Sequence, residues 1–246
     1  MRRRLLLVVA TVIAGWGLTG TASAQDFHKT YAIPAGGQIR IANVSGNVKV
    51  TGYKGDSIVV EAFKVGRDRD LLKVEDMSSG DRIDLKVGYP ERGNCDASVN
   101  FEVRVPQGIE YNYEHLASVS GNVEIVSVRG RLRAESVSGN VTVQNVTGVV
   151  SAQSVSGNVD VEISRLEGAG EMKFSSVSGD VSVKAPANLD ADIEMSSLSG
   201  SLKSDFPIEI HERRYGPGRS ARGRLGSGAN NLRITSVSGR VSLIRG

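Results

Sequence analysis

The sequence predicts an all-β protein built as a single β-solenoid, and three observations carry that prediction. Through the middle of the chain a glycine recurs every nine residues, and the longer motif SVSGN recurs every eighteen. Around each glycine, apolar and polar residues alternate with the period of a β-strand. After residue 25, no stretch shows the apolar spacing of three and four residues that a helix needs.

Each nine-residue unit is predicted to hold one short strand and one bend. Counted from the glycine, apolar residues fall at positions −2, +2 and +4, for example Val137, Val141 and Val143, and all three are expected in the core. Nine is an odd number, so an unbroken strand would turn every second unit inside out. A bend at the glycine or at the unit junction avoids this, and two units then make a turn of about eighteen residues. Ala134 and Ala152 at +4 predict a wall of small side chains facing a bulky one.

Polar residues next to the glycines are expected to hold the corners. Serine at −1 and asparagine at +1 bond to backbone groups in turns. A column of stacked hydroxyls could also grip a glycan or order water. The structural residues predicted for the repeat are Gly46, Gly121, Gly139, Gly157, Gly179, Gly200, Gly239, Ser120, Ser138, Ser156, Asn122, Asn140 and Asn158.

Residues 1–24 have the pattern of a cleaved signal peptide. Three arginines precede an apolar run that is shorter than the roughly 20 residues of a membrane span, and a small-x-small cleavage motif follows at Ala22. We expect a mature chain in the periplasm or outside the cell. Residues 25–113 are predicted to be a β-rich cap with most of the aromatic residues, and residues 114–246 to hold the solenoid repeats. The last strand, RVSLIR, is expected to end the coil with a free edge.

Charge excludes one class of partner and suggests a binding segment. The formal net charge of +3 equals the three arginines of the leading segment, so the mature chain is neutral and nucleic-acid binding is not expected. The insertion 206–228 is rich in glycine and arginine and is predicted to be an exposed loop. It could bind an acidic polysaccharide, lipid phosphates or an acidic protein, or simply be solvated. The candidate binding residues are Arg213, Arg214, Tyr215, Arg219, Arg222 and Arg224.

Catalytic and metal chemistry are not indicated. Cys95 is the only cysteine, so no internal disulfide forms, and the histidines lack metal-ligand spacing; no cofactor or metal is expected. Glu124, Asp160 and Glu162 could share a face, as a glycoside hydrolase requires, but carboxylates on solvated strands are common. We therefore favour a non-enzymatic binding scaffold whose partner is an envelope protein or polysaccharide. The alternatives are a carbohydrate-active enzyme on a solenoid frame and an envelope-stress or assembly factor that acts through protein contacts.

The repeated motifs also resemble a known family. SVSGNV, SVSGDV, the VPQG after the first third of the chain and the closing LRITSVSGRVSL are similar to the bacterial "putative adhesin" family of β-strand repeat proteins, a domain of unknown function. The resemblance covers nearly all of residues 27–245. It implies an exported β-solenoid of the bacterial envelope, and it carries over no catalytic residue.

Overall fold

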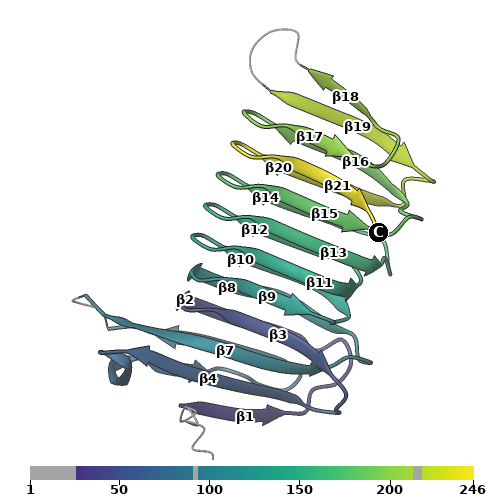
Figure 1. Cartoon of the computed structure of the whole chain (residues 1–246). Helices are drawn as coiled ribbons and strands as arrows, with labels where there is room; N and C mark the ends of the chain where they lie inside the picture. The colour runs from purple at the N-terminus through teal and green to yellow at the C-terminus, as the bar shows by residue number, and fades with distance from the viewer. Residues whose placement is uncertain (1–25, 91–93, 213–217) are drawn as a thin grey trace, which may run out of the picture.

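The structure is a computed structural model that describes residues 26–90, 94–212 and 218–246. The predicted signal peptide lies outside the described residues. The described residues form two long β-sheets, which lie face to face in a flattened coil, and one short 3-10 helix, η1 (Arg69–Leu71) (Figure 1).

The strand order within each sheet shows how the chain coils. The ten-stranded sheet has the order β1 (Phe27–Tyr31), β4 (Ile58–Gly66), β7 (Ala97–Pro106), β3 (Val48–Tyr53), β9 (Val123–Val126), β11 (Val141–Thr147), β13 (Val159–Arg165), β15 (Val181–Ala185), β21 (Val241–Arg245), β17 (Leu202–Ser204). The eleven-stranded sheet has the order β18 (Glu209–Glu212), β19 (Arg219–Leu225), β16 (Ala191–Ser197), β20 (Asn230–Ser236), β14 (Glu171–Ser176), β12 (Val150–Ser154), β10 (Gly130–Ser136), β8 (Tyr111–Ser120), β2 (Gln38–Ser45), β6 (Arg82–Gly88), β5 (Lys73–Asp76).

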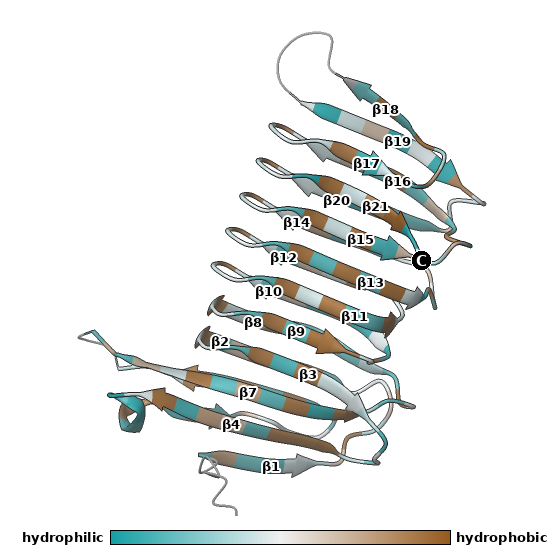
Figure 2. Ribbon diagram, in the orientation of Figure 1, coloured by the Kyte–Doolittle hydropathy of each residue, from teal (hydrophilic) through white to brown (hydrophobic). Residues whose placement is uncertain are grey.

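In the regular part, each turn of the coil gives one strand to each sheet, and equivalent strands pair in parallel. Leu132 lies beside Val150 in one sheet, and Val141 lies beside Val159 in the other, so these neighbouring turns are offset by eighteen residues. Apolar and polar residues alternate along these strands (Figure 2). The apolar residues of both sheets meet in one core, as the all-β, solenoid-like prediction required.

The core differs from the prediction at the corner. There the residue at −2 faces outward and the residue at −3 faces the core, the reverse of what was predicted. Val137, expected inside, is 44% exposed, whereas Ser136 is buried at 5%. The reason is the carbonyl of the corner glycine, which accepts a hydrogen bond from the inward side chain that valine cannot donate. The Ser136 hydroxyl donates to the Gly121 carbonyl at 2.8 Å. The same bond to the glycine of an adjacent turn is made by Ser118, Ser154, Ser176, Ser197 and Ser236.

The corner glycines are required because the turns approach closely. A Cβ on Gly139 would lie 2.2 Å from the Gly121 carbonyl oxygen, and no positive φ is involved. Beside this column, the Asn140 backbone N–H donates to the Asn122 side-chain oxygen at 2.9 Å, and Asn158 repeats the contact one turn further on. The asparagines therefore form the corner ladder predicted for them, while the serine of the ladder is the one at −3, not at −1.

Replacing a serine at −3 and a serine at −1 by alanine, one at a time, tests which of them belongs to the ladder. We expect Ser154→Ala to lower the free energy of unfolding by about 1–2 kcal/mol, because it removes the hydroxyl of a buried serine that donates to the Gly139 carbonyl. Ser156→Ala removes the same hydroxyl from an exposed position and should change stability by less than about 0.5 kcal/mol. Urea denaturation followed by circular dichroism measures both, and equal effects would contradict the buried ladder.

The order of the last turns departs from the order of the sequence. Strands β20 and β21, at the C-terminal end of the described chain, lie between β14/β15 and β16/β17, not at the end of the coil. The free edge predicted for RVSLIR is therefore wrong, since β21 pairs with β15 on one side and β17 on the other. The repeated motifs could not predict this strand order, because every turn offers nearly the same surface to a neighbour.

The segment predicted as the loop 206–228 contains two strands. β18 and β19 pair in antiparallel fashion, and β19 also pairs with β16 along its whole length. The hairpin covers the edge of β16 that a parallel turn would otherwise occupy. The prediction failed because the alternation in this segment is weak and its partner is distant in the sequence.

Antiparallel strands also finish the opposite end of the coil. β7 pairs with β4, and β4 with β1, in antiparallel fashion, whereas β2 and β3 pair in parallel with the turn that follows them. The aromatic residues of this region are mainly core residues. Tyr111 and Tyr113 are buried in an edge-to-face contact, with ring centroids 6.4 Å apart.

Candidate functional site

A column of exposed apolar side chains runs along the outer face of the eleven-stranded sheet. Each turn contributes the residue at position −2, immediately before the corner, and the exposed fractions lie between 42% and 45%. From one end to the other, the column consists of Val44, Val119, Val137, Val155, Val177, Val237 and Leu198. Single exposed apolar residues are ordinary, but a repeated and contiguous column is not.

Backbone hydrogen bonds hold this column in register. The Val155 N–H donates to the Ser136 carbonyl at 3.3 Å, and the Ser156 N–H donates to the Val137 carbonyl at 2.8 Å. Equivalent pairs connect the neighbouring turns. The parallel pairing thus continues past the last residue of each strand, so the apolar side chains stack at the strand spacing of about 4.8 Å.

The column forms one wall of a groove of about 750 Å³, which we term the valine groove. Six of the seven column residues line it, all except Leu198. Next to them, across the outer face, lie small residues such as Ala42, Ala117 and Ser175. The groove exists because these side chains are shorter than the valines on one side and the long polar side chains on the other.

The polar rim of the groove has a positive character. Glu135 is its only lining carboxylate. Its Oε1 atom forms an ion pair with Arg133 Nε at 2.7 Å, and its Oε2 atom lies 3.6 Å from His115 Nδ1. Burial lowers the pKa of His115, an effect that Glu135 opposes and Arg40 and Arg133 reinforce. At neutral pH the imidazole is therefore neutral.

Two lysines supply the free positive charge of the groove. Lys86 and Lys173 line it, and neither forms an ion pair with any residue that the structure describes. Lys86 lies between Ala42, through the β2–β6 pairing, and Glu75, through the β5–β6 pairing, and Lys173 lies beside Arg233 through the β14–β20 pairing. The groove thus combines an apolar wall with two lysines that form no ion pair with the described residues.

Half of the predicted arginine cluster can be placed. Arg213, Arg214 and Tyr215 lie outside the described residues. Arg222 and Arg224 lie on β19 and form ion pairs across to β16, with Glu194 at 2.8 Å and with Asp192 at 2.5 Å. The remaining member, Arg219, lies at the start of β19 and donates to the Gly200 carbonyl at 3.4 Å.

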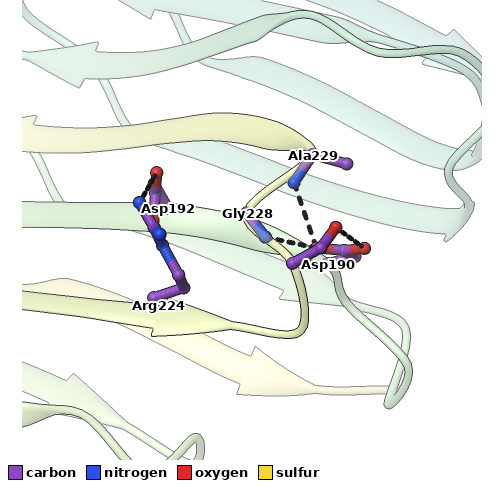
Figure 3. A network of polar contacts seen from close by, with 6 residues as sticks. Asp190, Asp192, Arg224, Gly228 and Ala229 are labelled. Carbon is purple, nitrogen blue, oxygen red and sulfur yellow. Dashed lines mark hydrogen bonds and ion pairs between the residues drawn. The ribbon is translucent and has the colours of Figure 1, made fainter.

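Arg224 of β19 belongs to a polar network that attaches the hairpin to the coil (Figure 3). Arg224 and Asp192 make two hydrogen bonds, and the guanidinium lowers the pKa of Asp192. Asp190 accepts from the Gly228 N–H at 2.7 Å and the Ala229 N–H at 3.1 Å, and such bonds lower its pKa. Binding of an external anion by this cluster stays a prediction; the ion pairs of Arg222 and Arg224 join β19 to β16.

The other candidate residues lie apart from the groove. Glu124 and Asp160 are on the outer face of the ten-stranded sheet, separated by Thr142, and Glu124 is paired with Lys49 at 3.0 Å. Burial, and then the neighbouring Asp180, raise the pKa of Asp160. Glu162 is paired with Lys184 at 3.0 Å. None of these three carboxylates lines the valine groove.

The remaining chemistry-bearing residues form no cluster. Cys95 is a free, half-buried thiol packed against the core. Within residues 26–90, 94–212 and 218–246, no group of three or more His, Cys, Asp or Glu side chains could hold a metal ion. Ser120, Ser138 and Ser156 at position −1 are exposed at the corners.

The valine groove was missed in the sequence although its signal is present there. Position −2 is valine or leucine in every main unit, while position −3 is serine in all but the first, where it is Asn43. If the small polar residue at −3 is placed in the interior, the residue at −2 faces outward. Asn43 fits the same rule, because its side-chain amide donates to the Val99 carbonyl at 2.7 Å.

Fold and groove together define an all-β, solenoid-like protein with a repeated apolar surface. The chain belongs to the Toastrack DUF4097 family, whose model matches residues 28–244. This is a domain of unknown function, and the match confirms the family resemblance seen in the motifs. None of the curated proteins compared with the chain matches it.

The solved structures that are similar to the chain include two proteins with names that mention adhesion. A putative cell adhesion protein from Clostridium sporogenes is 10% identical with a TM-score of 0.47, over 89% of this chain and 99% of that one. A putative adhesin from Bacteroides fragilis is 14% identical with a TM-score of 0.30, over 89% of this chain and 96% of that one. The terms "cell adhesion protein" and "adhesin" are the names of those two proteins.

Proposed function

We propose that this chain is an exported, non-catalytic binding scaffold of the bacterial envelope and that its ligand docks in the valine groove. The observation that carries the proposal is the column of seven exposed apolar residues, one from each turn. Contiguous apolar patches on soluble proteins usually mark interaction sites. A column held in register by every turn is typical of the extended binding surfaces of solenoid proteins.

The lining of the groove supports binding without catalysis. The serines behind the valines, such as Ser118 and Ser136, donate their hydroxyls to glycine carbonyls and so are committed as structural donors. Glu135 is engaged by Arg133, so it is not a free base. A nucleophile with an adjacent base, which covalent catalysis requires, is not assembled by these lining residues.

The leading segment supports export. Residues 1–24 carry the basic, apolar and small-residue regions of a signal peptide. The described part of the chain contains no helix with the length and apolar character that crossing a bilayer requires. An envelope location would bring the groove into contact with lipids, glycans and envelope proteins.

Site-specific photo-crosslinking tests this function. A photo-reactive amino acid replaces Val137 in the full chain, which is produced in a bacterial host and irradiated in the intact envelope. We expect covalent adducts from this position because it lines the groove. The matched control places the same amino acid at Val65, which is 51% exposed but belongs to β4, on the other sheet.

The adducts are read by mass spectrometry, which separates lipid, glycan and protein partners. Adducts from position 137 alone support the proposed site. Equal adducts from both positions, or none from position 137, would show that the groove is not the binding surface.

A further inference from the structure

The direction of the valine groove limits what can occupy it. Its long axis runs across the strands, so its apolar side chains repeat at about 4.8 Å. In an extended peptide, residues on one face repeat at about 6.6–6.8 Å, and one helical turn rises about 5.4 Å. Neither peptide spacing matches the column over several turns. A chain without a side-chain repeat has no such conflict.

Backbone pairing also disfavours a peptide in the groove. A peptide that adds to a sheet needs unpaired N–H and C=O groups at a strand edge. The strands beneath the middle of the groove, β10, β12 and β14, each pair with strands on both sides. Only side chains face the occupant, and along one wall they are aliphatic.

The charge of the groove indicates the chemistry of the other end of the ligand. Lys86 and Lys173 have no ion-pair partner among the described residues, and the only lining carboxylate is already paired with Arg133. His115 is neutral at neutral pH. An anionic group would compensate the lysines, whereas a neutral apolar ligand would leave them as they are.

We infer that the valine groove binds a single molecule of an anionic lipid, with its acyl chain along the valines and its acidic group at Lys86 or Lys173. This inference rests on the proposed function and names its ligand class. From Val44 to Val237 the column crosses five inter-strand spacings, or about 24 Å, which accommodates an extended sixteen-carbon chain. The acyl chain is flexible, and because it has no side-chain repeat it can pack along the valines without matching their spacing.

Calorimetric titration of the mature chain with palmitate, below its micellar concentration, tests the inference. We expect saturable binding near one molecule per chain, and about tenfold or greater weakening in Val137→Ser/Val155→Ser, because that double variant removes two valines from the middle of the wall. Val65→Ser removes a similarly exposed valine from the other sheet and should bind palmitate like the natural chain. Circular dichroism verifies that each variant is folded.

The acidic group is tested separately. Hexadecanol has the same chain without the charge and should bind several-fold more weakly than palmitate. Lys86→Gln/Lys173→Gln should remove most of that difference, because it removes the two lysine charges that line the groove. Equal affinity of the natural chain for both compounds would overturn the anionic assignment.

Other outcomes would overturn the inference in ways that identify the true occupant. Sedimentation with phosphatidylglycerol vesicles, without palmitate binding, would point to a bilayer surface. Dimers that are lost in Val137→Ser/Val155→Ser would point to a second copy of the chain. Protein or glycan adducts at position 137, with no palmitate binding, would keep the proposed function and reject the lipid, whereas absence of adducts from the groove rejects the proposed function itself.

Discussion

Gly139→Ala is expected to lower the free energy of unfolding by about 3 kcal/mol, the upper part of the usual range for overpacking. The new Cβ would lie 2.2 Å from the Gly121 carbonyl oxygen and 2.6 Å from its carbon. Both atoms belong to the backbone of the adjacent turn, so no side chain can rotate away. Relief requires the two turns to separate, which would also strain the hydrogen bond from Ser136 to Gly121.

Gly108→Ala is the matched control for this prediction. A Cβ there meets no atom within 4 Å, and its backbone is not in the positive-φ region. We expect a change in stability of less than about 0.5 kcal/mol. Urea denaturation followed by far-ultraviolet circular dichroism gives both values, and a Gly139→Ala chain as stable as the control would refute the close stacking of turns.

Ending the chain at Ala229 should unfold the C-terminal part of the coil, because the lost strands are internal. β20 and β21 supply Leu232, Ile234, Val241 and Leu243 to the core, each at most 1% exposed. At roughly 1.5–3 kcal/mol for each side chain, their burial contributes on the order of 6–12 kcal/mol. That is comparable with the whole stability of a typical domain.

Hydrogen exchange measured by mass spectrometry tests this truncation. We expect β16 to lose its protection, while β10 and β12 keep theirs. Although β19 still pairs with β16 in the shorter chain, β20 is the strand that joins both of them to β14 and the rest of the coil. A chain that ends at Ile244 loses only the exposed last residues and serves as the control. Retained protection of β16 in the shorter chain would mean that β16 stays folded with β19 without β20, and would contradict the need for the inserted turn.

The inserted turn also bears on folding. β14 and β20 pair although about sixty residues separate them, as Phe174 beside Ile234 shows. Non-local pairing of this kind is slow to form because the intervening chain must be ordered first. Until β20 and β21 arrive, β14/β15 and β16/β17 each present an unpaired edge, which makes this region the expected site of mispairing between nearly identical turns.

Local sequence patterns predicted the parts of the fold that repeat. The nine-residue glycine period, the alternation around it and the asparagine at +1 were sufficient for an all-β coil with ladders at its corners. They were insufficient at −3 and −2, where apolarity alone placed Val137 inside. The corner carbonyl of Gly121 reverses that choice because it accepts from Ser136, and such a need is not visible in a hydropathy pattern.

The candidate site was therefore only half predictable. The arginines of the 206–228 segment stood out in the sequence, yet Arg222 and Arg224 are engaged by β16, a strand that lies well before them in the chain. The valines of the groove were noticed as core residues, and Lys86 and Lys173 were not noticed at all. Their shared face depends on which strands lie side by side, which a single period does not specify.

The sequence by itself determined the regular turns: their eighteen-residue offset, their glycine corners and the stacking of like residues, because these follow from local spacing and from the size of glycine. Only the tertiary structure decided which of two neighbouring residues faces the core, where the insertion of β18 and β19 packs, and that the last turn enters between earlier ones. Those features depend on hydrogen-bond partners and strand edges contributed by distant segments. Near-identical repeats offer the same local energy to several neighbours, so local energy alone cannot choose among them.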